Sequence, residues 1–236
     1  MAYDFKKEYK DLYLPKAKPS LIEVPAMNFV AVAGTGDPNQ NGGFYQQALE
    51  LLYGFSYTIK MSKMGSWQPE GYFDFVVPPL EGFWWISGEP FNGTGIQDKT
   101  ALSWISLIRQ PDFVTAKSFE HACSLMVEKK PNLAHFISGG KLQFLRFSEG
   151  LCAQVMHRGS YDSEPATIEK LEEFIKDQDF SLDIGKIENA SPQEILEALN
   201  RGEDFPPFRF HHEIYLSDPR RTKPENLKTV IRHPIV

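Results

Sequence analysis

A carboxylate and a phenol stand two residues apart in residues 210–218, and together they could activate water or hold a cation. The β-branched and aromatic residues of this run predict a strand. Successive side chains of a strand point to opposite faces, so Glu213 and Tyr215 share one face with His211, and Ile214 lies on the other. We expect helices to cover the Ile214 face and the Glu213 face to line a cavity. The competing interpretation is an exposed sheet face on which Glu213 only meets water.

The composition is that of a globular protein rich in aromatic side chains, with 18 Phe, 9 Tyr and 4 Trp. This surplus indicates an aromatic-lined pocket, or a core that uses Phe in place of Leu. A net charge of -6 offers no basic surface, so we expect no nucleic-acid partner. Neither a signal peptide nor a membrane span is evident, which predicts a cytoplasmic protein without a membrane partner. Cys123 and Cys152 lie in apolar runs and are expected to be buried free thiols.

The familiar motifs of metal sites, dinucleotide sites and serine hydrolases are missing from the sequence. The His and Cys residues do not follow the spacing of metal ligands. Gly34 and Gly36 lack the third glycine of a dinucleotide-binding loop. The Gly-x-Ser-x-Gly elbow of serine hydrolases is also missing. We therefore expect no metal and no cofactor, and any chemistry must come from side chains.

Hydrophobic periodicity and turn signals predict the elements that position these residues. Strands are predicted at residues 21–25, 29–33, 72–77, 83–86, 104–111, 141–147, 151–157, 210–218 and 229–234, with residues 141–157 as a hairpin. Helices are predicted at residues 44–59, at residues 115–129, after Pro165, and after a capping box that begins at Ser191.

The predicted elements occur twice in the same order. A strand pair ends at Gly34-Thr35-Gly36-Asp37 in the first half and at Gly159-Ser160-Tyr161-Asp162 in the second, and a helix and two strands follow each time. The last strands contain Ile108-Arg109-Gln110-Pro111 and Ile231-Arg232-His233-Pro234. From Gly34 to Arg109 is 75 residues, and from Gly159 to Arg232 is 73 residues. The sequence therefore predicts a duplicated strand–helix–strand–strand module.

This duplication predicts an α+β fold, in which two modules with antiparallel sheets are related by a pseudo-twofold axis and a ligand groove lies at their junction. The single domain of residues 1–236 divides into a surface lead-in (1–19), a first repeat (20–112), a linking helix (113–140) and a second repeat (141–236), with an inserted segment at about 185–207.

The aromatic strand of the first repeat corresponds to the Glu213 strand of the second, so we expect the two strands to meet across the groove. Adjacent residues of a strand point oppositely, so the sequence leaves open whether Trp84 or Trp85 faces the groove. The competing interpretation is that both indoles only pack the two sides of the strand.

Three runs resemble the GyrI-like small-molecule-binding superfamily: residues 79–85, residues 107–111 and residues 211–221. The resemblance extends from about Leu21 to Val236. Members include the effector domains of multidrug-sensing regulators and of AraC-type activators. The runs look most like a stand-alone branch without a DNA-binding domain, in which some proteins hydrolyse the cyclopropane ring of DNA-alkylating cyclopropanoid natural products. The resemblance implies a pocket at the repeat junction, a central glutamate at Glu213 and a paired-aromatic motif at Trp84 and Trp85.

One segment departs from this branch. Residues from about Gly185 to Pro207 are longer than expected, and they enter just before the Glu213 strand. This segment could cap or narrow the pocket, so the ligand class depends on it.

Two functions fit these residues. In an enzyme, an aromatic wall would raise the pKa of Glu213 towards neutrality and Glu213 would deprotonate water. Tyr215 or Tyr161 would stabilise the oxyanion, although Tyr161 could equally be a turn residue that covers a helix start. Trp84 and Trp85 would hold a flat substrate, with His211 at the pocket edge. In a binding protein, the same residues would hold a planar cation without chemistry. The sequence shows no helix-turn-helix pattern, and it leaves the oligomeric state open.

Overall fold

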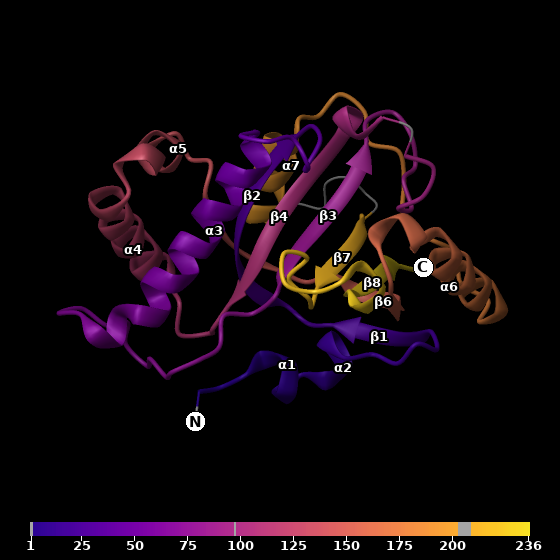
Figure 1. Cartoon of the computed structure of the whole chain (residues 1–236), viewed down its shortest axis with the longest axis horizontal. Helices are drawn as coiled ribbons and strands as arrows, with labels where there is room; N and C mark the ends of the chain where they lie inside the picture. The colour runs from indigo at the N-terminus through magenta and orange to yellow at the C-terminus, as the bar shows by residue number, and fades with distance from the viewer. Residues whose placement is uncertain (1, 97, 203–208) are drawn as a thin grey trace.

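The computed structural model describes residues 2–96, 98–202 and 209–236, and these residues form a single antiparallel sheet with helices around it (Figure 1). The strand order within the described residues is β1-β6-β8-β7-β3-β4-β2-β5. The strands are β1 (Ser20–Val24), β2 (Met27–Thr35), β3 (Leu80–Ile86), β4 (Leu102–Gln110), β5 (Gln143–Phe147), β6 (Gly150–Arg158), β7 (His211–Tyr215) and β8 (Lys228–Pro234). The α-helices are α1 (Phe5–Glu8), α2 (Lys10–Tyr13), α3 (Phe44–Met61), α4 (Ala116–Lys129), α5 (Ala134–Ser138), α6 (Pro165–Asp177) and α7 (Pro192–Asn200). The short 3-10 helices are η1 (Ser62–Met64), η2 (Lys99–Ala101), η3 (Pro131–Leu133), η4 (Tyr161–Ser163) and η5 (Pro224–Asn226).

The strand order confirms the duplicated module. The first repeat supplies β1, β2, α3, β3 and β4, and the second repeat supplies β5, β6, α6, β7 and β8 in the same sequence. If each strand is replaced by its equivalent in the other repeat, the result is the same strand order read from the opposite edge of the sheet. The pseudo-twofold axis therefore passes between β3 and β7, and the predicted α+β class is confirmed.

The two repeats exchange their first strands, which the sequence did not predict. β1 pairs with β6, with Ser20 opposite Gln154, and β5 pairs with β2, with Phe147 opposite Met27. The predicted hairpin over residues 141–157 is therefore wrong, because β5 is at one edge of the sheet and β6 is second from the other edge. Glu149 is buried where the chain passes from one repeat to the other.

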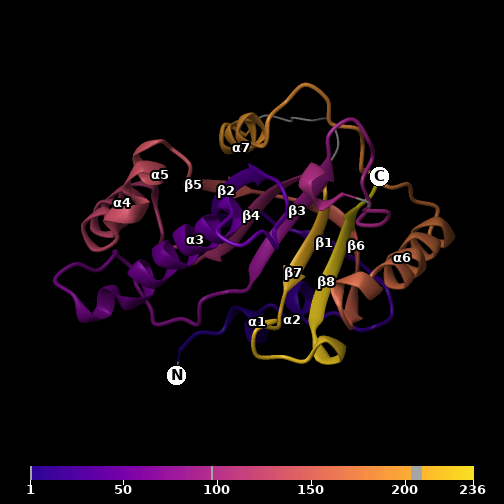
Figure 2. The same ribbon diagram turned by 45° about the horizontal axis from the view of Figure 1, so that its top comes forward.

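The equivalent helices α3 and α6 lie on the sheet face that carries Glu213. Phe44 of α3 stacks on Trp104 of β4, with ring centroids 5.8 Å apart. Ile168 of α6 packs in a cluster with Ile231 of β8, the residue opposite Glu213 in the register. Figures 1 and 2 show α3 and α6 at the two sides of this face, with β3 and β7 between them. The long helix of each repeat therefore packs on the face of Glu213, whereas α2 of the lead-in lies on the face of Ile214, where we expected helices.

The lead-in of residues 2–19 packs into the opposite side of the sheet. The Tyr13 hydroxyl donates to Glu81 Oε1 at 3.3 Å. The guanidinium of Arg109 lies 4.7 Å from the ring of Phe5 and 4.1 Å from the ring of Tyr9. Aromatic rings therefore cover a buried arginine, and the lead-in belongs to the core, contrary to the surface position we expected.

Several smaller predictions were also tested. The strand predicted at residues 72–77 is wrong, because of these residues only Phe75 forms a bridge, to Tyr3. The capping box at Ser191 is confirmed and begins α7, which packs on β2, β4 and β5. Residues 203–207 of the segment 185–207 lie outside the described residues. Cys123 and Cys152 are confirmed as buried free thiols. In the described part of the chain, no helix has the length and apolar character needed to span a membrane.

Candidate functional site

The carboxylate of Glu213 is held by two neighbours on its own strand. His211 Nε2 lies 2.8 Å from Glu213 Oε1, and the Tyr215 hydroxyl donates to Glu213 Oε2 at 2.7 Å. The three side chains meet because alternate residues of β7 share one face. The Glu213 side chain retains 14% of its accessible surface, so solvent or a ligand can reach it.

Trp84 joins this group from the neighbouring strand. Its indole Nε1 donates to the Tyr215 hydroxyl at 2.8 Å. Trp84 pairs with His211 in the register of β3 and β7, which places the indole on the Glu213 face. On the other side of the indole lies Tyr45 of α3, with ring centroids 5.8 Å apart. Our expectation that the two strands face each other across a groove is therefore wrong, since they are hydrogen-bonded neighbours.

Trp85 points to the opposite side of the sheet. It packs against Phe210, with ring centroids 5.2 Å apart, and is buried. Of the two indoles, the structure therefore brings Trp84 to Glu213 and does not bring Trp85 there.

Tyr161 approaches the group from η4, just before α6. Its ring meets that of Tyr215 edge-on, with centroids 5.8 Å apart, and 39% of Tyr161 is exposed. Burial and the charge of Glu213 raise the pKa of Tyr161 to about 12. The phenol therefore keeps its proton at neutral pH and can donate a hydrogen bond to a bound molecule.

A second carboxyl group, which the sequence reasoning missed, lies against Glu213. Glu164 precedes α6 and is only 3% exposed. Burial and the negative charge of Glu213 raise the pKa of Glu164 to about 10, although the nearby Thr229 hydroxyl opposes this. Glu164 therefore carries a proton at neutral pH, and the two carboxyl groups share a hydrogen bond.

The two carboxyl groups, of Glu213 and Glu164, differ in their protonation. Burial would raise the pKa of Glu213, but the hydrogen bonds from His211, Tyr215 and protonated Glu164 outweigh burial and lower it. We expected an aromatic wall to raise this pKa towards neutrality. The structure gives the opposite direction, because three donors surround the carboxylate. Glu213 is therefore the ionised member and Glu164 the neutral one.

His211 lies beneath Glu213 and is fully buried, so it is not at an exposed pocket edge. Its Nδ1 lies 2.9 Å from Nε2 of His233 on β8. Gly93 presses against the His211 ring, since a Cβ atom at this position would overlap it. His211 therefore contacts Glu213 from the sheet interior, and a bound molecule would contact the exposed side of the Glu213 carboxylate.

Comparison with known proteins identifies the family to which this fold belongs. A family model described as the GyrI-like small molecule binding domain matches residues 17–194. The chain belongs to the GyrI-like family. Its domain is thus a small-molecule-binding domain, as the resemblance in its sequence implied. No match was found among curated proteins.

Solved structures from Listeria innocua resemble this GyrI-like chain over its whole length. An uncharacterised conserved protein is 43% identical, with a TM-score of 0.82, and the alignment covers 99% of this chain and 100% of that chain. A protein described as a hydrolase is 41% identical, with a TM-score of 0.79 and the same coverage. Another described as a hydrolase is 40% identical, with a TM-score of 0.80 and complete coverage of both chains.

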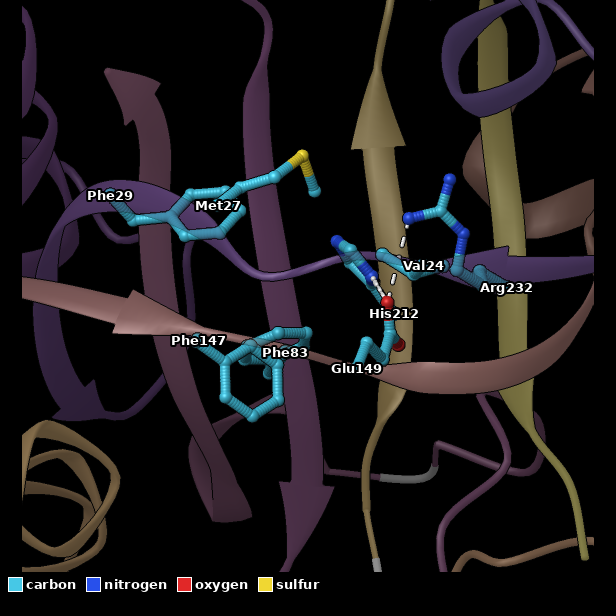
Figure 3. A pocket seen from close by; sticks show the side chains of 8 residues that line it. All are labelled: Val24, Met27, Phe29, Phe83, Phe147, Glu149, His212 and Arg232. Atoms are coloured by element: carbon cyan, nitrogen blue, oxygen red, sulfur yellow. Dashed lines mark hydrogen bonds and ion pairs between the residues drawn. The ribbon is translucent and has the colours of Figure 1, made fainter. Parts of the chain in front are cut away.

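The other face of the GyrI-like sheet holds a buried network of charges (Figure 3). His212 lies between two carboxylates, with Nδ1 2.9 Å from Glu149 Oε2 and Nε2 3.1 Å from Glu81 Oε2. Arg232 Nη1 lies 3.4 Å from the same Glu149 oxygen. Burial alone would lower the pKa of His212, but the two carboxylates outweigh it and raise the pKa. His212 is thus an internal cation that balances buried anions.

A cavity beside this network has a volume of about 10 Å³ and is lined by Met27, Phe83 and Glu149, among others. That volume suits one water molecule and no organic ligand. Among the residues that the structure describes, no group of His, Cys, Asp or Glu is placed to hold a metal ion. On the opposite face, by contrast, the Glu213 side chain retains 14% of its accessible surface.

Sequence reasoning missed three residues of this face: Glu164, Tyr45 and His233. An acidic residue before Pro165 is typical of a helix start, so nothing in the local pattern distinguished Glu164. Tyr45 lies beside the predicted apolar stripe of α3. His233 was part of the repeated motif that ends the second repeat, and that repetition was the one signal that could have drawn attention to it.

Proposed function

We propose that this protein binds flat aromatic molecules over Trp84 and Tyr215 and hydrolyses the strained cyclopropane ring of cyclopropanoid genotoxins, with Glu213 activating water. The observation that carries this proposal is the pair of carboxyl groups with opposite protonation, since Glu213 is ionised and Glu164 is neutral. Glu213 is also the member that solvent can reach. The Listeria proteins described as hydrolases, which share about two fifths of their sequence with this chain, support the reaction class.

The reaction adds one water molecule to a ring that is conjugated to a dienone carbonyl. Glu213 accepts a proton from water while the water oxygen bonds to the unhindered ring carbon. The ring C–C bond breaks, and its electron pair moves through the conjugated system to the carbonyl oxygen, which becomes a phenolate. The proton on Glu213 then passes to the phenolate or to bulk water. The product differs from the substrate by one added water.

Two neighbours support this step. The exposed Tyr161 hydroxyl donates a hydrogen bond to the oxygen on which negative charge develops. Protonated Glu164 limits the site to one negative charge and fixes one edge of the Glu213 carboxylate. The indole of Trp84, locked by its bond to Tyr215, gives the flat substrate a rigid surface.

A second function, binding without chemistry, is favoured by the direction of the Glu213 pKa. A carboxylate whose pKa is lowered is a weak base, but it is a permanent anion. An anion beside Trp84, Tyr215 and Tyr45 suits a planar cationic ligand, for which aromatic faces add cation–π attraction. In this function the protein would sense or sequester cationic drugs.

A Glu213→Gln variant separates the two functions. The variant keeps the shape of the side chain and removes both its negative charge and its basicity. If the protein is a hydrolase, turnover of a spirocyclopropyl dienone, followed by loss of dienone absorbance and a mass gain of one water, falls at least about a hundredfold. Binding of the neutral substrate stays within a few fold. Unchanged turnover would exclude Glu213 as the base.

A matched control and a dye complete the experiment. Glu169→Gln changes an exposed glutamate on α6 and should leave turnover unchanged. A planar cationic dye, titrated by tryptophan quenching, tests the second function. If the protein binds ligands without chemistry, Glu213→Gln weakens dye binding, and the wild type shows no turnover of the dienone. A protein that neither quenches with the dye nor hydrolyses the dienone would contradict both functions.

A further inference from the structure

A histidine that has no part in the proposed reaction lies directly behind the His211–Glu213 pair. His233 on β8 is fully buried, and its Nε2 lies 2.9 Å from His211 Nδ1. His211 Nε2 in turn lies 2.8 Å from Glu213 Oε1. The two imidazoles and the carboxylate thus form a chain of hydrogen bonds that runs from the sheet interior to the site.

This chain of hydrogen bonds, from His233 through His211 to Glu213, allows only two arrangements of protons. Each bond needs one proton, and an ionised Glu213 can only accept, so His211 Nε2 must donate. The bond between the imidazoles then carries its proton either on His233 Nε2 or on His211 Nδ1. His233 Nδ1 is buried without a hydrogen-bond partner among the described residues, so it does not decide between the two arrangements. In both arrangements His211 Nε2 donates to Glu213.

The surroundings hold this chain in place. Asn92 is tied to α6 by its side-chain amide, which donates to Glu172 Oε1 at 2.6 Å. Phe91 meets the His211 ring edge-on, with centroids 5.8 Å apart, and Gly93 closes the same side. In the register, Trp84 lies opposite His211 and Ala153 lies opposite His233. The hydrogen bonds end at Glu213, whose ionisable neighbours include Tyr215 and Glu164.

We propose that His233 is a positioning residue, which fixes the ring orientation and the protonated nitrogen of His211 so that His211 Nε2 always donates to Glu213. The same logic operates where a buried partner orients a catalytic histidine. Burial and the neighbouring His211 hold the pKa of His233 well below its usual range, consistent with a neutral ring. The inference rests on the proposed importance of Glu213, but its consequence is a protonation pattern that can be observed without any substrate.

The test measures protons directly in the full-length protein. Nitrogen-15 labelling of histidine shows by NMR which ring nitrogens carry protons, and carbon-13 labelling of glutamate follows the titration of Glu213. In the wild type at pH 7 we expect His211 Nε2 to carry a proton. In His233→Leu we expect a mixture of His211 tautomers and a Glu213 titration midpoint at least about one pH unit higher. In His233→Gln, whose amide can still bond to His211 Nδ1, we expect most of this shift to be reversed.

Several outcomes decide the proposal. An unchanged His211 pattern and an unchanged Glu213 midpoint in His233→Leu would overturn it, as would a wild type in which His211 Nε2 lacks its proton. If His233→Leu does not fold, the wild-type pattern and the His233→Gln variant decide instead. His121→Gln, which changes an exposed histidine on α4, controls for signal assignment and should alter neither readout. If no variant, including the wild type, hydrolyses the dienone, the proposed reaction fails while the NMR result still stands.

Discussion

The indole nitrogen of Trp84 lies 2.8 Å from the hydroxyl oxygen of Tyr215, and this bond connects side chains of the two repeats at the site. Tyr215 accepts from Trp84 and donates to Glu213, so its single proton is already used. Tyr215 therefore positions Glu213, and the exposed hydroxyl of Tyr161 is the better donor to a ligand oxygen.

Replacement of Trp84 by Phe tests the contribution of this bond. The variant keeps an aromatic ring but removes the N–H donor, so we expect stability to fall by about 1 kcal/mol and binding of a planar dye to weaken. Denaturant unfolding and dye titration measure the two effects. Trp85→Phe is the matched control, because Trp85 lies on the other face; equal losses of dye affinity in both variants would contradict our placement of the ligand.

Tyr161→Phe tests the proposed oxyanion donor. The ring and its contact with Tyr215 remain, so substrate binding should change little. Loss of the hydroxyl should lower the turnover of a spirocyclopropyl dienone about a hundredfold, the cost of one such donor. Tyr57→Phe removes an exposed hydroxyl on α3 and should have no effect. A Tyr161→Phe variant with wild-type turnover would show that the oxyanion is stabilised elsewhere.

Glu164 makes stability depend on pH in an unusual direction. Its pKa is about 10 in the folded protein, against an ordinary value of 4.5. Between these values the unfolded chain loses this proton and the folded chain keeps it, so the contribution of Glu164 to stability falls as the pH rises. Glu164→Gln, which still donates a hydrogen bond, should remove this slope and be more stable than the wild type at pH 9 by about 1.4 kcal/mol or more.

Urea unfolding at pH 5, 7 and 9 measures this effect. We expect the difference in unfolding free energy between Glu164→Gln and the wild type to grow at each step. Glu169→Gln, on the exposed side of α6, is the control for loss of a carboxylate. A difference that stays constant or shrinks towards pH 9 would mean that Glu164 is ionised in the folded protein.

Glu149→Gln tests the buried network on the other face. The change leaves Arg232 and His212 without the anion that they share, so we expect a loss of about 3–5 kcal/mol. The pKa of Glu149 is lowered, because His212 and Arg232 outweigh burial, so its contribution is complete above pH 4.5 and fades as the pH falls further. The pKa of His212 is raised, so its contribution is complete below pH 6.5 and fades as the pH rises further. The loss should therefore be greatest between these two values.

Denaturant unfolding at pH 5.5 measures this loss. Exposed Glu23 on β1 provides the control substitution, Glu23→Gln, which should change stability by less than about 0.5 kcal/mol. A loss of that small size in Glu149→Gln would show that the network contributes little.

The repeat could be predicted because its signals are local. Turn residues at Gly34 and Gly159, and the motifs around Arg109 and Arg232, lie at matching distances along the chain. The partner of each strand could not be predicted, because pairing depends on contacts between distant residues. The register of β1 with β6 joins Ser20 to Gln154, and no short-range pattern specifies it.

In the site, too, local patterns could be predicted and contacts between distant elements could not. Alternation along β7 placed Glu213 with Tyr215, and the structure agrees. Alternation along β3 separated Trp84 from Trp85, but only the pairing of β3 with β7 decides which indole lies beside Glu213. Glu164 and His233 enter from other elements, and the direction of the Glu213 pKa depends on the donors that those elements bring. The protonation of the site therefore follows from the tertiary structure.

The exchange of first strands has a consequence for synthesis on the ribosome. β1 emerges early, but its partner β6 begins only at Gly150, so the first repeat must wait with an unpaired strand. A chain that stopped after residue 140 would leave β2 without its neighbour β5 as well. Such a half would present open strand edges, which can pair with the same edges of another copy. Neither half of this protein is therefore a module that can be transplanted by itself, and the smallest unit that pairs all of these strands is the complete duplication.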